Sequence, residues 1–141
     1  MISGGTINQP LGRDPKDRLK QAVLSNGREA ITHYRVIDRF KSHTHVKVIL
    51  ETGRTHQIRV HLSHIGFALV GDLVYGGKLR FPKKASEDLK FELQNFRRQA
   101  LHSRKLSLNH PESGDLISWN IPLPEDMQTL LNFFTKFDKG K

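Results

Sequence analysis

The sequence of 141 residues has no cysteine and no long apolar run. Without cysteine there can be no disulfide, no thiolate metal site and no cysteine nucleophile. The longest uncharged apolar run, Ile65 to Gly71, is far shorter than the about 20 residues that a membrane-spanning helix requires. The first ten residues also lack the cationic and apolar regions of a secretory signal. We therefore expect a cytoplasmic protein with no membrane partner.

What the chain has in excess is positive charge. Its 23 lysines and arginines exceed its 14 acidic residues, giving a net charge of +9 and a pI near 10.1. Such a balance favours a polyanionic partner, which could be nucleic acid, an anionic membrane or an acidic protein. The cations recur along the whole chain beside Gly- and Pro-containing loops, and no basic amphipathic helix with an aromatic face is visible. This pattern favours a folded surface that follows a phosphate backbone.

The hydrophobic pattern of the first half predicts a loop, a hairpin and a helix. Residues 1–27 are rich in turn formers and are expected to be loop, with one short extended piece over residues 6–8. Ala30 to Phe40 and the alternating residues 46–50 predict an antiparallel hairpin. The spacing then changes, with Thr55 as a candidate N-cap and Gly66 as a candidate C-terminal residue of an amphipathic helix.

The second half predicts two more helices around a second hairpin. Ser86 is expected to cap a helix that carries Leu89, Leu93 and Phe96. Residues 101–110 and 116–121 predict antiparallel strands joined by a turn, and a last helix that starts at Pro124 is expected to dock on the sheet. With 36% hydrophobic and 26% charged residues, the chain is expected to be one α+β domain over residues 1–141.

The densest polar stretch is Glu51 to His61, with the sequence ETGRTHQIRVH. On a helical wheel of about 100° per residue, Ile58, Leu62 and Ile65 share one face and are expected to meet the core. Gln57, His61 and His64 then fall on a separate flank, whereas Arg59 borders the buried face. A guanidinium held there can bind a carboxylate or a phosphate through two parallel hydrogen bonds.

Two roles for Arg59 stay open at this point, because an ion pair with a residue of the sheet explains the same pattern. Arg54 and the free N–H groups of the first helical turn form a second candidate anion site. The histidines do not predict a metal site: His56 and His61 lie on different faces of the helix, and no cysteine or inward carboxylate completes a set. No phosphate-binding glycine loop or nucleophile elbow is present, and Asp72 is expected to be a turn former.

Taken together, several motifs resemble the RluA family of RNA pseudouridine synthases, and within it the D-type branch that acts on large-subunit ribosomal RNA. The resemblance covers most of the 141 residues in order, and its central segment is Thr52 to His61. It continues through Ile65-Gly66, Val70-Gly71-Asp72, Tyr75-Gly76, Ala100-Leu101-His102 and His110-Pro111.

The resemblance implies isomerisation of uridine to pseudouridine in RNA without cofactor or metal. In the family an aspartate attacks a flipped-out uridine, the glycosidic bond breaks, and the base is rotated and rejoined through carbon. The second arginine of the T-G-R-T-H-Q-I-R motif pairs with that aspartate, and here it is Arg59. Leu101 is implied to line the pocket, whereas Arg54, His56 and Gln57 are implied to shape or contact it. The implied fold is a mixed, mostly antiparallel sheet flanked by helices and loops.

The sequence also departs from the family pattern. The nucleophile of the family lies in an H-R-L-D motif, which is absent here, so none of the eight aspartates can be assigned that role. Neither Tyr34 nor Tyr75 occupies the motif of the pocket tyrosine, and the N-terminal RNA-binding domain of D-type members is missing. The chain thus resembles the C-terminal part of the catalytic domain. It is expected to be inactive alone and to expose a sheet edge and apolar surface.

These observations leave three hypotheses of function. The first is an enzyme portion that supplies Arg59 and an RNA-binding surface to an aspartate elsewhere, with structured RNA and the missing N-terminal part of the same enzyme as partners. The second is a non-catalytic RNA-binding module. The third, a DNA-binding protein, predicts equal affinity for duplex DNA and structured RNA at matched salt.

Overall fold

The computed structural model describes residues 2–139 as an α+β arrangement in which the strands form three separate antiparallel sheets. The largest has the order β1-β4-β5, with β1 at Gly4–Asn8, β4 at Ile31–Arg39 and β5 at Thr44–Leu50. Two smaller sheets pair β2 (Leu11–Arg13) with β3 (Gln21–Val23) and β6 (Lys105–Asn109) with β7 (Leu116–Asn120). The helices are α1 (Gln57–His64), α2 (Glu87–Asn95) and α3 (Glu125–Lys139).

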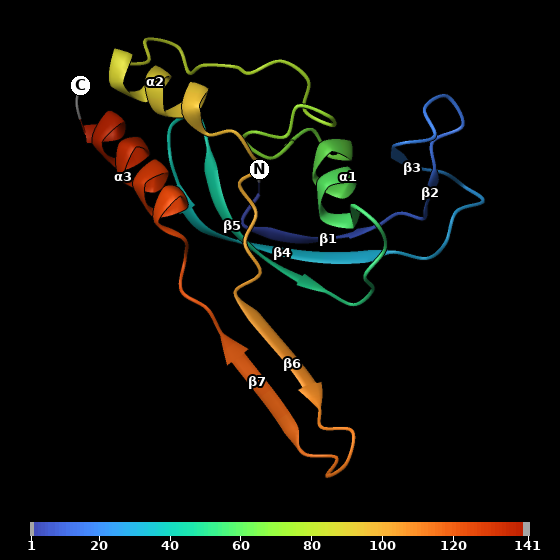
Figure 1. Cartoon of the computed structure of the whole chain (residues 1–141). Coiled ribbons are helices and arrows are strands. Elements are labelled where there is room, and N and C mark those ends of the chain that lie inside the picture. The colour runs from blue at the N-terminus through green and yellow to red at the C-terminus, as the bar shows by residue number, and fades with distance from the viewer. Residues whose placement is uncertain (1, 140–141) are drawn as a thin grey trace.

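Figure 1 shows α2 and α3 side by side at one end of the β4–β5 hairpin, with α1 lying over the other part of the sheet. The β6–β7 hairpin projects away from both groups. No helix among residues 2–139 is long and apolar enough to span a membrane.

Two buried clusters hold these parts together. Leu89 and Leu93 of α2 pack against Leu130 and Phe134 of α3, and the ring of Phe40 at the end of β4 stacks on Phe134 with centroids 5.5 Å apart. In a second cluster, Val60 of α1 packs on a pair from the N-terminal segment, Leu11 and Ala30. The last helix therefore docks on α2 and on the end of one hairpin, rather than on the broad face of a sheet.

The short extended piece expected at residues 6–8 is confirmed as part of β1, but the prediction of loop for the rest of residues 1–27 is wrong, because β2 and β3 also lie there. Gly27 does lie in a turn, where its N–H donates to the Leu24 carbonyl at 2.9 Å, but glycines of this segment also let other groups approach the backbone closely. A Cβ on Gly27 would lie 2.6 Å from the carbonyl carbon of Leu11, and one on Gly5 would lie 3.0 Å from Tyr34 Oη. The prediction of one mixed sheet is likewise corrected to three antiparallel ones.

The remaining elements follow the sequence closely, with shifts at their ends. The β4–β5 hairpin is confirmed, and the hydroxyl of Ser86 caps α2 by accepting a hydrogen bond from the Leu89 N–H at 3.2 Å. The strand predicted from residue 101 begins only at Lys105. Thr55 does not cap α1; His56 takes that position in the left-handed region, with φ 54°.

Candidate functional site

The face that α1 buries is not the one predicted from its apolar residues. Leu62 is buried as expected, but Ile58 and Ile65 are only half-buried, and the polar Gln57 and His61 are covered almost completely. The wheel placed this polar pair on a separate flank because it counted hydrophobicity alone. Buried polar side chains are tolerated where every donor and acceptor has a partner, and both residues meet that condition.

The Gln57 side chain fastens the start of α1 to β4. Its Nε2 donates to the carbonyl of Ile31 at 3.0 Å and to Thr32 Oγ1 at 2.9 Å. Its Oε1 accepts from the Thr52 hydroxyl at 2.7 Å and from the Arg54 N–H at 3.0 Å. Because the whole amide is used, Gln57 fixes the start of α1 against β4.

His61 extends the same network across the helix. Its Nε2 lies 2.9 Å from the Gln9 carbonyl, and its Nδ1 lies 2.7 Å from Thr32 Oγ1. A carbonyl can only accept, so Nε2 carries the proton and Nδ1 accepts from the threonine hydroxyl. Burial lowers the pKa of His61 below the ordinary 6.5, and the neighbouring His64 acts in the same direction against the opposing effect of the Gln9 carbonyl. This histidine is therefore a neutral structural group.

Arg59 lies on the adjoining stripe of α1 and forms an ion pair with Asp72. The Nε donates to Oδ2 at 2.8 Å and Nη2 donates to Oδ1 at 3.0 Å, while the two side chains are 14% and 1% exposed. Burial raises the pKa of the Asp72 carboxyl, but the hydrogen bonds from Arg59 and from the backbone N–H groups of Tyr75 and Val74 outweigh it, so the pKa lies below its ordinary value. The pair is therefore charged at neutral pH.

Asp72 is positioned by a tight turn that glycine makes possible. Its Oδ1 accepts from the N–H groups of Val74 and Tyr75, each at 3.2 Å, which is the turn-forming role that the sequence predicts. Gly71 has φ +80°, and a Cβ there would lie 2.0 Å from the Arg98 carbonyl oxygen. The turn thus fixes the carboxylate that holds Arg59, a second role that the sequence analysis missed.

One edge of the Arg59 guanidinium is not used by Asp72. Asp72 occupies the Nε–Nη2 edge, and within residues 2–139 the structure shows no hydrogen bond from Nη1. The edge formed by Nη1 and the second Nη2 hydrogen has the spacing that a carboxylate or a phosphate accepts.

Tyr75 covers Arg59 and links it to His56. The guanidinium carbon of Arg59 lies 4.9 Å from the centroid of the Tyr75 ring, and Lys20 Nζ lies 5.3 Å from it. The Tyr75 hydroxyl accepts from the Gln21 N–H at 3.0 Å and bonds to His56 Nδ1 at 2.8 Å. The sequence offered one signal for these two residues: Asp72 directly follows Val70-Gly71, and Tyr75 comes three residues later.

The other predicted residues lie at the margin of this cluster. The Nε of Arg54 donates to the Glu29 carbonyl at 2.8 Å, so that side chain is held against the start of β4. Leu101 is half-buried on a segment whose Ala100 N–H donates to the Val70 carbonyl at 2.8 Å, which places it beside the turn that carries Asp72. The structure thus brings Arg59, His56 and the segment of Leu101 to one region, although no hydrogen bond or ring contact joins Leu101 to Arg59.

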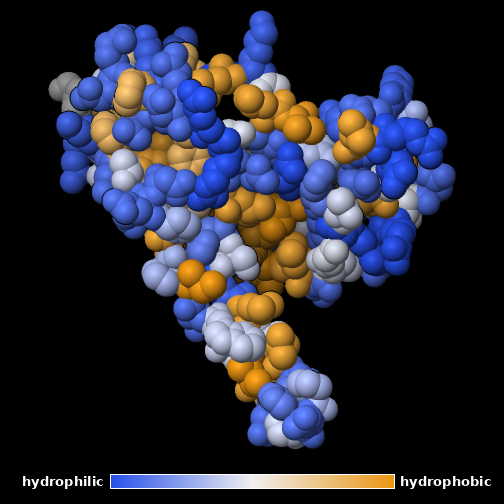
Figure 2. Space-filling model, viewed as in Figure 1, coloured by the Kyte–Doolittle hydropathy of each residue, from blue (hydrophilic) through white to orange (hydrophobic). Residues whose placement is uncertain are grey.

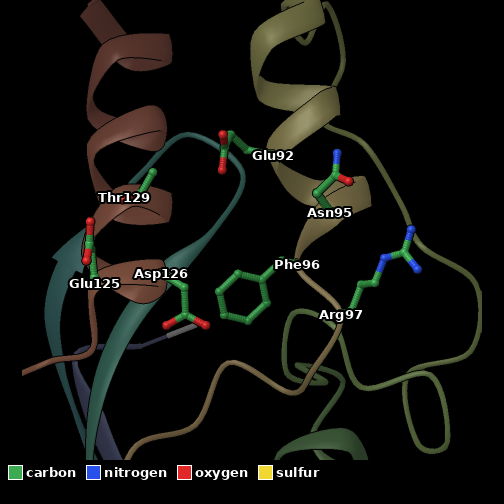
Figure 3. Close-up of a pocket in the computed structure, with 7 residues that line it drawn as sticks. All are labelled: Glu92, Asn95, Phe96, Arg97, Glu125, Asp126 and Thr129. Carbon is green, nitrogen blue, oxygen red and sulfur yellow. The ribbon is translucent and has the colours of Figure 1, made fainter.

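Two surface hollows do not contain Arg59. One lies between α2 and α3 (Figure 3), where Asp126 and Phe96 face each other and Arg97 lies at the far side. Its three carboxylates, from Glu92, Glu125 and Asp126, make it unsuited to a phosphate backbone. The second hollow, on the β1-β4-β5 sheet, is lined by the cationic residues Arg35 and Lys47 and fits such a partner better.

Comparison with known proteins finds a family to which part of the chain is similar. The family model described as RNA pseudouridylate synthase matches residues 2–64. Residues 2–64 are therefore similar to this family, as the motifs of the sequence predict.

The similar curated proteins are bacterial enzymes named ribosomal large subunit pseudouridine synthase D. The chain is 57% identical to the one from Pseudomonas aeruginosa over 132 residues, covering 94% of this chain and 41% of the relative. It is 52% identical to that of Xanthomonas campestris, over 94% of this chain and 40% of the relative. For the one from Escherichia coli K12 the identity is 50%, over 93% and 40% of the two chains. The chain therefore spans about two-fifths of the length of these relatives.

The fold has a counterpart among solved structures. Human RNA Pseudouridylate Synthase Domain Containing 4 superposes with a TM-score of 0.66 and 26% sequence identity. The superposition covers 94% of this chain and 57% of that chain.

Proposed function

We propose that this chain provides one wall of the active site of an RNA pseudouridine synthase that isomerises uridine in large-subunit ribosomal RNA in the cytoplasm. The nucleophilic aspartate comes from polypeptide outside the two-fifths that the relatives share with this chain. The observation that carries the proposal is the guanidinium of Arg59, held by Asp72 and with its other edge directed to no partner within residues 2–139.

In this site Arg59 binds two carboxylates at once. Asp72 holds the Nε–Nη2 edge, and the nucleophile is received on the Nη1–Nη2 edge. A carboxylate paired in this way stays ionised, which attack on the uridine requires. The Tyr75 ring covers the guanidinium and keeps water from it.

The cations spread over the chain support RNA as the substrate. Twelve of the 23 lie in three groups along the sequence: residues 13–20, 78–84 and 97–105. Neutralisation of several phosphates makes affinity fall steeply with salt concentration. A flat response to salt would contradict both this proposal and the simpler role of an RNA-binding module.

The test is an activity assay by complementation. The chain is co-expressed with the part of the Pseudomonas aeruginosa relative that lies outside the match, and pseudouridine is counted in a large-subunit ribosomal RNA transcript. We expect turnover from the pair, none from either part alone, and none with Arg59→Ala. Binding of RNA without turnover in every combination would instead favour the non-catalytic module.

A conservative variant separates catalysis from charge. Arg59→Lys keeps the cation but cannot receive two carboxylates on two planar edges. We expect RNA affinity and its salt dependence to stay unchanged while turnover falls by about two orders of magnitude. Unchanged turnover would show that Arg59 acts only as a positive charge.

A further inference from the structure

The β6–β7 hairpin carries an apolar face that no other element among residues 2–139 covers. The register sets Leu106 opposite Trp119 and Leu108 opposite Ile117. Residues that face one another across two strands, and residues two apart along a strand, point to the same side. These four side chains therefore form one continuous apolar face, here called the hairpin face, in which Leu106 is 57% and Trp119 is 46% exposed.

The opposite side of the hairpin is polar apart from one residue. Ser107 and Ser118 join their hydroxyls across it at 2.8 Å, beside Asn109 and Asn120. Leu116 is the exception and is 70% exposed. The clean division into an apolar and a polar side is the pattern of strands that have one side buried.

Nothing among residues 2–139 buries that side. The hydrogen bonds that the structure shows for residues 105–120 all lie within the hairpin, and the Ile121 N–H donates to the Arg104 carbonyl at its base. Figure 1 shows the hairpin projecting from the body, and in Figure 2 apolar surface runs along it and on into the middle of the molecule. A two-stranded hairpin is marginally stable in water unless further strands or a helix cover it.

The relatives indicate what the missing cover is. Any contiguous stretch of 132 residues in a chain of 141 includes residues 10–132, so the match with the Pseudomonas aeruginosa protein takes in the whole hairpin. That relative carries the hairpin in a polypeptide of which 59% lies outside the match, since 41% is covered. RNA is a poor occupant because the hairpin face offers it no cation.

We propose that the hairpin face is the docking surface for the polypeptide that corresponds to the unmatched three-fifths of the relatives. This inference rests on the proposed function, in which the same polypeptide brings the nucleophile, and it names the contact that holds the two parts together. The apolar side chains enter a shared core, while the polar side of the hairpin stays in water.

The test measures binding separately from turnover. The full chain is co-expressed with a tagged polypeptide made of the unmatched part of the Pseudomonas aeruginosa relative, and the dissociation constant of the purified pair is measured. We expect a stable complex whose dissociation constant rises at least about tenfold for Leu106→Ser and for Trp119→Ser. The matched control is Leu116→Ser, which makes the same change on the more exposed, polar side and should leave the complex unchanged.

The outcomes separate this inference from the proposed function. A complex that forms and depends on Leu106 but gives no pseudouridine would support the docking surface and overturn the function. A complex that turns over RNA with equal affinity for all three variants would support the function and overturn the docking surface. Failure of the tagged polypeptide to bind the wild-type chain, or a homodimer of this chain that Leu106→Ser dissociates, would also overturn it. The thermal unfolding midpoint of each variant is the control for folding, and it should equal that of the wild-type chain.

Discussion

The helix α1 and the β6–β7 hairpin present two opposite ways of placing side chains. On α1 the polar Gln57 and His61 are buried, and each of their polar groups has a partner within the chain. On the hairpin the apolar Leu106 and Trp119 are exposed and are covered by nothing among residues 2–139. The polar groups of the first region are all paired, whereas the second region exposes a contiguous apolar surface of the kind found at interfaces.

The two regions differ in whether the partners of their side chains lie within this chain. The network around α1 fixes Arg59 and Asp72 without outside help, and so the wall of the site is formed in advance. The hairpin and the unused edge of Arg59 both point to a second polypeptide, one through apolar surface and the other through charge. Substitutions in the two regions should therefore have very different effects on the stability of the chain itself.

The largest effect is expected at Gly71. Gly71→Ala would place a Cβ 2.0 Å from the Arg98 carbonyl oxygen, on a residue that already has a positive φ. We expect loss of at least about 4 kcal/mol of unfolding free energy, measured by chemical denaturation. Gly77→Ala is the control, because Gly77 also has a positive φ, +71°, but open space around it. Equal losses for the two variants would mean that the close approach is not what matters.

Removal of Arg59 should come next. Arg59→Ala leaves the buried carboxylate of Asp72 without its cation, which costs about 3 kcal/mol in comparable buried pairs. The double variant Arg59→Ala with Asp72→Asn should recover part of this loss, because no unpaired charge remains. Denaturation midpoints at pH 7 measure both, and strictly additive losses would contradict the pairing.

The pH dependence of stability should report His61. Its pKa is lowered in the folded state, so above pH 6.5 it is neutral in both states and its contribution is complete. As the pH falls below 6.5, the unfolded chain binds a proton that the folded chain does not, and the free energy of unfolding decreases. His43, whose pKa burial also lowers, acts in the same direction.

We therefore expect His61→Leu to be less stable than wild type at pH 7, by about 2 kcal/mol, because Thr32 and Gln9 lose a partner. The gap between the two proteins should narrow as the pH falls toward 5. Val60→Ala on the same helix is the control, because it removes buried packing but no titratable group and should lower the stability by the same amount at each pH. Parallel profiles for wild type and His61→Leu would refute the role of His61.

The smallest effect is expected on the hairpin. Leu106→Ser should change the unfolding free energy of the isolated chain by less than about 0.5 kcal/mol, because this side chain is more than half exposed and belongs to neither buried cluster. A loss above about 1 kcal/mol in thermal or chemical unfolding would show that the hairpin face is already covered. The two regions are compared most directly by the unfolding free energies of Leu106→Ser and His61→Leu, because only the second variant should lose stability.

The sequence predicted what local pattern determines. The β4–β5 hairpin and the Ser86 cap follow from spacing and residue type. The buried polar side of α1 could not be predicted, because it depends on partners far along the chain, such as Gln9 and Thr32. For the same reason Asp72 was recognised as a turn former and not as the partner of Arg59, 13 residues away.

The hairpin shows the opposite case. The sequence predicted its two strands, and the resemblance predicted exposed apolar surface without giving its place. The structure shows such surface at Leu106, Leu108 and Trp119. What residue patterns cannot supply is the identity of the cover, because that depends on another stretch of polypeptide. Binding experiments are needed for that step.

The most direct measurement is a crystal structure of the chain in complex with the unmatched part of the Pseudomonas aeruginosa relative. The account predicts that an aspartate of the added polypeptide lies within about 3 Å of Arg59 Nη1, while Asp72 keeps the Nε–Nη2 edge. An added polypeptide that leaves this edge empty, or that takes the place of Asp72, would contradict it.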